Sequence, residues 1–171
     1  MSSLIKNRQA VADDFTLLRL ADGEAAETVA LPAGPLLVPL AVWRARKAEL
    51  QARGAPLGVW LDVGEGPEAI ADELAAFAVI GVNFPKFTDG RGYSTARLLR
   101  QRHGFEGEIR AIGDVLHDQL FLMARCGFDA FALKDGKNAE LALRAFETFR
   151  EPYQAAVDRA EPLFRRHRRA A

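Results

Sequence analysis

Residues 57–84 read LGVWLDVGEGPEAIADELAAFAVIGVNF, and this stretch decides the fold class. Two short apolar runs, at residues 57–62 and 77–84, enclose an amphipathic segment that opens with Gly66 and Pro67. A proline at the first helical position, followed by carboxylates near the positive end of the helix dipole, is typical of a helix start. The stretch therefore predicts a strand, a helix and the strand of a second βα unit.

The same alternation continues on both sides of this stretch. Downstream, we expect strands at residues 108–113 and 128–133, each followed by a helix. Upstream, residues 36–40 predict a strand that leads into a helix over residues 41–53. Consecutive βα units imply parallel strands joined by right-handed crossovers.

The helix starts also carry expected signals. Ser94 or Thr95 is a candidate N-cap for the helix after residue 84, and Asp114 for the helix that ends at Gly127. The last βα unit predicts a helix over residues 137–150, stopped before Pro152.

Two architectures compete for this α/β pattern. The central strands of an open, flavodoxin-like sheet are buried on both faces and are nearly all apolar. Here Arg110 lies inside one predicted strand, and Asn83 and Asp129 lie in two others. Inward-pointing polar side chains near strand ends suit a curved sheet, so we expect a partial TIM-barrel-like sheet, with the open sheet as the alternative.

The chain divides into three parts by composition. Residues 1–34 predict a small β-rich appendage, in which residues 13–20 are the best strand. Residues 35–151 form the βα-repeat domain, and residues 152–171 predict a helical tail that ends in the basic run RRHRR. The edge strand that a partial barrel leaves open makes a homo-oligomer an expectation.

Composition excludes several classes of function. Lys plus Arg total 23 and Asp plus Glu also total 23, so no net charge draws the chain to nucleic acid. Cys126 is the single cysteine, which excludes an iron–sulfur cluster or a disulfide built within one chain. The longest apolar stretch, residues 31–43, is too short and too rich in proline to span a membrane. We expect a cytoplasmic protein without an export signal.

The loop that follows the strand at residues 77–84 is the richest candidate site. It reads NFPKFTDGRGYS, and its glycines and helix start suit an anion or an anionic cofactor. Lys86 and Arg91 would supply positive charge there, although a mutual ion pair with Asp89 is the competing interpretation. The candidate binding residues are Lys86, Asp89, Gly90, Arg91, Gly92, Tyr93 and Ser94.

Further polar side chains follow the other predicted strands. Asp114 and His117 are spaced as an acid–base pair one helical turn apart, and are the candidate catalytic residues. The simpler interpretation is a helix cap and a surface histidine. Asp62 and Lys134 complete the predicted rim, and two aspartates without a third ligand do not predict a metal site. The sequence contains no G-x-G-x-x-G or phosphate-loop motif.

Three segments resemble a known bacterial family. They are VNFPKFTDGRGYSTARLLR at residues 82–100, GEIRAIGDVLHDQLFLMARCGFDAF at residues 107–131 and PLLVPLAVW at residues 35–43. All three are similar to the domain-of-unknown-function family nine-three-four, and FPKFTDGRGYS is the most specific part of the match. Genes of this family commonly lie beside those of assimilatory sulfite reductase, and its members are described as oxidoreductases in sulfite reduction.

The resemblance implies an accessory role in sulfur assimilation, with sulfite reductase as the partner and a small anion as the ligand. One cysteine cannot ligate the cluster that sulfite reduction needs, so the chain is not the catalytic subunit. An oxidoreductase role would require an organic cofactor such as flavin or NADPH. The alternatives are a non-catalytic partner or assembly factor of the reductase, and an unrelated barrel-type enzyme.

Overall fold

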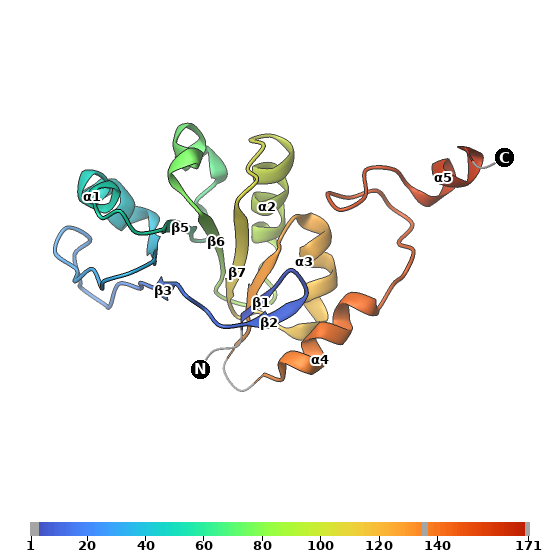
Figure 1. Ribbon diagram of the computed structural model, residues 1–171, viewed down its shortest axis with the longest axis horizontal. Helices are drawn as coiled ribbons and strands as arrows, with labels where there is room; N and C mark the ends of the chain where they lie inside the picture. The colour runs from blue at the N-terminus through green and yellow to red at the C-terminus, as the bar shows by residue number, and fades with distance from the viewer. Residues whose placement is uncertain (1–3, 135–136, 170–171) are drawn as a thin grey trace.

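A computed structural model of the chain describes residues 4–134 and 137–169. One sheet runs through it, and helices follow the parallel strands in turn (Figure 1). The strands are β1 (Leu4–Lys6), β2 (Gln9–Val11), β3 (Thr16–Leu17), β4 (Leu36–Pro39), β5 (Leu57–Leu61), β6 (Val79–Phe84), β7 (Glu108–Gly113) and β8 (Ala130–Ala132). The helices are α1 (Leu40–Ala52), α2 (Arg91–Gln101), α3 (Leu120–Cys126), α4 (Ala139–Arg144) and α5 (Leu163–Arg169), with 3-10 turns η1 (Pro67–Ala76), η2 (His117–Gln119) and η3 (Ala145–Glu147).

The strand order distinguishes the two expected architectures. The sheet has eight strands in the order β2-β1-β8-β7-β6-β5-β4-β3, and all pairs from β3 to β8 are parallel. The order of these strands never reverses, whereas an open flavodoxin-like sheet contains a switch point. The sheet curls into half a barrel with helices on its outer side, which confirms the partial barrel and excludes the open alternative.

The N-terminal residues extend this sheet at both edges. β1 pairs antiparallel with β8, and β2 pairs with β1 to form one edge. The chain then crosses the inner side of the sheet, opposite the helices, and β3 joins β4 at the other edge (Figure 1). Of the strand expected at residues 13–20, Thr16 and Leu17 pair with Leu36 and Leu37, and the Leu18 N–H donates to the Leu37 carbonyl (2.9 Å).

Two apolar layers hold the half barrel together. The larger layer lies between the sheet and the helices, and includes Trp43 and Phe77, whose ring centroids are 4.8 Å apart. Burial of one such large side chain contributes ~2–3 kcal/mol. The smaller layer lies on the inner, concave face, where Leu37, Trp60, Val79 and Ile112 pack together.

Two expected helix caps are wrong. Helix α2 begins at Arg91, so Ser94 and Thr95 lie within it, and the Asp89 carboxylate accepts the bond from the Arg91 N–H (3.1 Å). The helix starts early because Gly92 lets it approach the sheet: a Cβ there would lie 2.6 Å from the Phe84 ring.

Asp114 is likewise not a cap, because the helical turns begin later, at His117. Gly113 has φ +94° and turns the chain, so that Asp114 faces the neighbouring loop instead.

The C-terminal segment also differs from expectation. Helix α4 begins at Ala139 because the Asn138 side chain caps it, accepting bonds from Glu140 (2.8 Å) and Leu141 (3.2 Å). Residues 148–162 contain no helix, and only α5 follows them. We call residues 148–169 the arm, and Figure 1 shows its end projecting from the half barrel.

Candidate functional site

A pocket of about 400 Å³ opens on the concave face, beside the carboxyl ends of β7 and β8. One wall is the segment from Asp13 to Arg19, which crosses the sheet and which we call the strap. In barrel folds, ligands bind at the carboxyl ends of parallel strands, so this sheet pocket is the leading candidate. Its lining residues are Asp13, Phe15, Leu17, Arg19, Leu37, Arg110, Ile112, Gly113, Ala132, Leu133 and Lys134.

Arg110 forms the floor of the sheet pocket. Its side chain is 3% exposed, and its Nε donates to Glu108 Oε1 (2.6 Å) while Nη1 donates to Asp13 Oδ1 (2.7 Å). Lys6 adds a second cation 2.7 Å from Glu108. A buried cation must be paired, and here the pairing also ties the strap to the sheet across 97 residues of sequence.

Arg19 lies at the opposite end of the strap from Asp13, and its contacts differ from those of Arg110. Its guanidinium carbon is 5.3 Å from the centre of the Trp60 ring, and Nη2 donates to Asn83 Oδ1 (3.3 Å). The Trp60 indole N–H in turn donates to the Leu18 carbonyl (2.9 Å), which holds the strap in place. Among the described residues, no carboxylate pairs with Arg19, so its charge is available to a ligand.

Asp62 and Asn83 support Arg19 from the strand ends. The Asn83 amide donates to Asp62 Oδ1 (2.8 Å), which fixes the amide so that its oxygen faces Arg19. Gly113 has φ +94° and leaves room for this amide, because a Cβ there would lie 2.8 Å from Asn83 Oδ1. Asp62 thus acts on the site through Asn83.

Asp114 and Lys134 form an ion pair at the mouth of the pocket, with 3.0 Å between Nζ and Oδ1. The Lys134 bond lowers the pKa of the Asp114 carboxyl, and a bond from the Phe87 N–H (3.2 Å) adds to the effect. Asp114 therefore stays ionised at neutral pH and joins the loop after β6 to the end of β8.

The predicted anion loop lies outside the sheet pocket. Arg91 binds Asp89 through two side-chain bonds (3.0 and 2.7 Å), which lower the pKa of Asp89 to about 2. Lys86 is exposed, and its ammonium group makes no hydrogen bond or ion pair in the described part of the chain. The Tyr93 ring lies 5.6 Å from Phe84, and burial raises the pKa of its phenol. Of the two interpretations of this loop, its geometry favours the mutual ion pair.

The candidate catalytic pair is not joined in the structure. His117 is exposed in η2, and no hydrogen bond or ion pair between described residues links it to Asp114. Nor do any three His, Cys, Asp or Glu side chains of the described residues gather as ligands for a metal ion.

Sequence reasoning missed Asp13 and Arg19. Both side chains line the sheet pocket. They are six residues apart and therefore lie on the same side of an extended chain. That period-two pattern, with Phe15 and Leu17 between them, is the signal that could have placed them on one face.

Together, the half barrel and the pocket at its strand ends define an α/β protein with a partial barrel-like sheet and a candidate ligand pocket. The chain belongs to a family described as "Bacterial protein of unknown function (DUF934)", whose family model matches residues 58–164. The similar segment at residues 35–43 lies before the matched range. No curated protein matches the chain. None of the helices among residues 4–134 and 137–169 is long and apolar enough to cross a membrane.

Proposed function

We propose that the chain is an accessory protein of assimilatory sulfite reduction that binds a small oxyanion in the sheet pocket. The observation that carries the binding site is Arg19, a guanidinium at the pocket wall with no carboxylate partner among the described residues. The assignment to sulfite reduction is supported by the family resemblance, since related genes lie beside those of assimilatory sulfite reductase.

The chemistry of the pocket suits an oxyanion such as sulfite. A guanidinium presents parallel N–H donors that match the oxygens of such an anion. Trp60 lies under Arg19 and keeps it flat against the pocket wall. Lys134 lines the same pocket and is 60% exposed, so that its ammonium can turn from Asp114 toward a ligand.

Calorimetric titration with sulfite, sulfate and phosphate tests the site. We expect Arg19→Ala to weaken sulfite binding tenfold or more. Arg91→Ala, an equal loss of charge in the loop at residues 83–94, which we call the rim loop, should leave it unchanged. The reverse pattern would move the site to the rim loop, and no binding by the intact protein would end the proposal.

Growth on different sulfur sources tests the assignment to sulfite reduction. A strain that lacks the gene should fail on sulfate and on sulfite and grow on sulfide or cysteine. Rescue by the wild-type gene but not by the Arg19→Ala variant would connect the pocket to the process. Normal growth on all four sulfur sources would contradict the assignment.

A non-catalytic partner of sulfite reductase is the second candidate, and the arm favours it. Tyr153 and Phe164 on the arm are 72% and 51% exposed, as side chains that dock on another protein often are. If this candidate is correct, the reductase co-purifies with the Arg19→Ala variant but not with a chain truncated at Pro162.

A further inference from the structure

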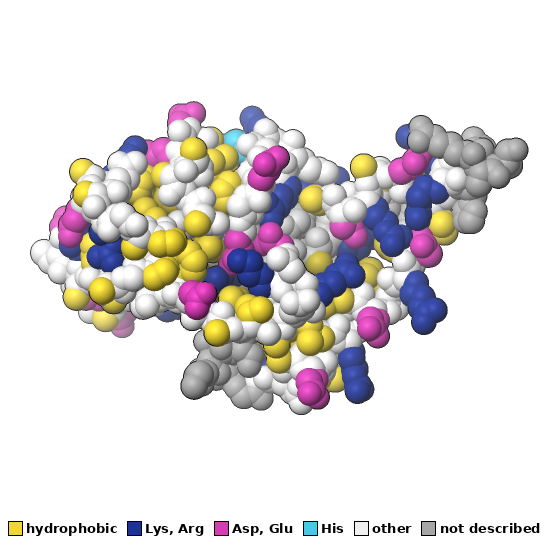
Figure 2. Space-filling view, viewed as in Figure 1, with side chains coloured by type: hydrophobic (Ala, Val, Ile, Leu, Met, Phe, Trp, Pro, Cys, Tyr) yellow, Lys and Arg dark blue, Asp and Glu magenta, His cyan; other side chains and the backbone are white. Residues whose placement is uncertain are grey.

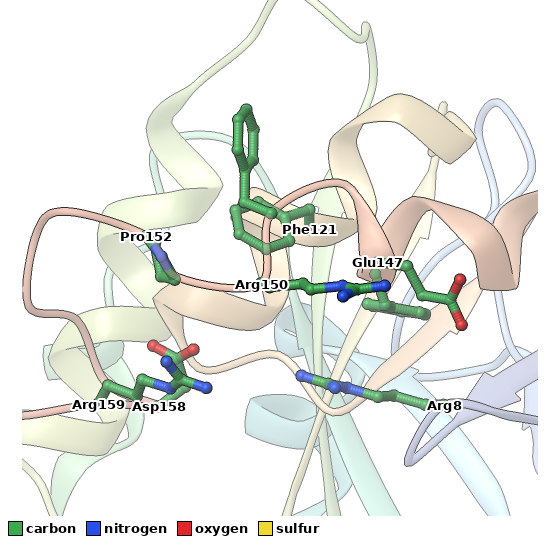
Figure 3. A pocket seen from close by; sticks show the side chains of 9 residues that line it. Arg8, Phe121, Glu147, Arg150, Pro152, Asp158 and Arg159 are labelled. Carbon is green, nitrogen blue, oxygen red and sulfur yellow. The ribbon is translucent and has the colours of Figure 1, made fainter. Parts of the chain in front are cut away.

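A second pocket, of about 480 Å³, lies between the β1–β2 hairpin, α3 and the start of the arm. Figure 3 shows Arg8 and Arg159 reaching into it from opposite sides, with the Arg150 guanidinium above that of Arg8 in the view. We call it the arginine pocket. Its volume falls within the range of about 300–1,000 Å³ that is usual for sites of small molecules.

Arg8 is held in a backbone conformation that does not suit it. The hairpin turn consists of Asn7 (φ 50°) and Arg8 (φ 62°), both in the left-handed region. Asparagine tolerates such a position, but a turn of this type favours glycine after it. Arginine instead of glycine costs stability, and it places a guanidinium 5.6 Å from the Phe146 ring centre, inside the pocket.

The guanidiniums of Arg8 and Arg150 are unpaired. Neither makes a hydrogen bond or an ion pair with any of the described residues, whereas Arg159 pairs with Glu151 (2.9 Å). Of the two carboxylates that line the pocket, Asp158 pairs with Arg125 (3.4 Å). The other, Glu147, points away from the space between Arg8 and Arg159 in Figure 3. Like charges placed together without partners repel, and a bound anion would remove that repulsion.

Aromatic rings form the rest of the pocket. Phe121 and Phe149 lie 5.3 Å apart between ring centres, and Phe149 is 60% exposed. Phe149 lines the same pocket as the three arginines, and such an exposed ring offers a surface on which a planar ring can stack. Figure 2 shows the dark-blue Lys and Arg side chains gathering where the arm leaves the body.

We propose that the arginine pocket binds a phosphorylated aromatic small molecule of the mononucleotide class. Arg8, Arg150 and Arg159 hold the phosphate, and the planar ring of the ligand stacks on Phe149. The ligand joins the hairpin to the arm, because Arg8 belongs to the body and the other two arginines belong to the arm.

Titration with AMP and flavin mononucleotide tests this site, with inorganic phosphate and either adenosine or riboflavin as the separate halves of the two ligands. At least one mononucleotide should bind tenfold or more tightly than either half. Arg8→Gly should weaken that binding tenfold or more, and Arg44→Ala on the distant α1 serves as the control. Arg8→Gly suits the turn, so a loss of binding cannot be attributed to misfolding.

Limited trypsin digestion gives an independent measurement. The bound mononucleotide should slow cleavage after Arg150 and Arg159, and should not slow it in the Arg8→Gly variant. Phosphate that binds as tightly as the mononucleotides, poly-glutamate that binds when they do not, or no binding at all would each overturn the proposal.

This inference stands apart from the sheet pocket. Arg19→Ala should weaken sulfite binding tenfold or more and leave mononucleotide binding unchanged, and Arg8→Gly should do the reverse. Each proposal can therefore fail while the other holds.

Discussion

The sheet pocket and the arginine pocket use the same side chains in opposite ways. On the floor of the sheet pocket, Arg110 is buried, stacks 5.4 Å from the Phe15 ring centre and bonds to two carboxylates. In the arginine pocket, Arg8 is exposed over Phe146, and its charge has no partner among residues 4–134 and 137–169.

The difference shows that the bonds of an arginine in a pocket indicate whether it serves the fold or a ligand. Arg110 completes its bonds within the chain, so it holds the fold together and has little left for a ligand. Arg8 and Arg150 make no such bonds, and Arg8 also lies in an unfavourable turn, so their guanidiniums are available to a ligand. Arg19 resembles the second group, which is why the proposed oxyanion site rests on Arg19 and not on Arg110.

Removal of the Arg110 side chain tests the first half of this comparison. Arg110→Met leaves Glu108 and Asp13 without their shared cation, and should lower the free energy of unfolding by about 3–5 kcal/mol. Urea denaturation measures the change, with Arg97→Ala on the exposed face of α2 as the control. A loss of unfolding free energy below about 1 kcal/mol would mean that the strap stays packed on the sheet without the ion pairs.

Gly113 tests the packing of the same pocket. Gly113 and Gly64 have similar positive φ values, +94° and +90°, but only at Gly113 would a Cβ meet other atoms, with Phe84 O at 2.4 Å. Gly113→Ala should therefore destabilise by about 1–3 kcal/mol more than Gly64→Ala. Comparing the thermal unfolding of the two variants separates the steric clash from the backbone strain, which both variants share. Equal losses of stability would contradict a clash at Gly113.

Arg8 tests the second half of the comparison. Arg8→Gly relieves the left-handed turn, and should raise the free energy of unfolding by about 0.5–1 kcal/mol without a ligand. Asn7→Gly should change it less, because asparagine already tolerates the conformation. Destabilisation by Arg8→Gly, measured in the same urea series, would mean that Arg8 serves the fold.

We expect the smallest effect from Arg91 in the rim loop. This cation is intermediate between Arg110 and Arg8, because it is exposed but paired with a carboxylate. In Arg91→Ala, the pKa of Asp89 should rise from about 2 toward its ordinary 3.8. Because folding lowers this pKa, the stability that the pair contributes is present above about pH 4 and is lost as the pH falls toward 2. An NMR titration of the Asp89 carboxyl measures the change; an unchanged pKa would show that Arg91 is not its partner.

Much of the fold could be predicted from the sequence because its signals are local. The strand expected at residues 108–113 is β7 with the same bounds, since apolar runs between turns report directly on buried strands. Polar residues such as Arg110 within strands indicated the curved sheet correctly. The caps at Ser94 and Asp114 failed, because close packing of Gly92 and the turn at Gly113 moved the helix starts.

The sheet pocket could be predicted only in part. Asp62 and Lys134 lie at the ends of predicted strands, so their place on the rim was accessible from topology. The partner of Arg110 was not, because Asp13 lies 97 residues away and reaches it only when the strap crosses the sheet. Similarly, Arg100 looks like one of several surface arginines, yet it bonds to the carbonyls of Phe105 (2.6 Å), Gly107 (2.7 Å) and Gly127 (3.0 Å).

The pairing of β1 with β8 has a consequence for how the chain folds during synthesis. Residues 4–6 leave the ribosome well before residues 130–132, which are their partners in the sheet. The parallel strands β4 to β7 can pair in the order in which they emerge, whereas the β1–β2 hairpin cannot join β8 until most of the chain has been made. Such distant pairing slows folding, so we expect closure of this edge to be the late, rate-limiting step.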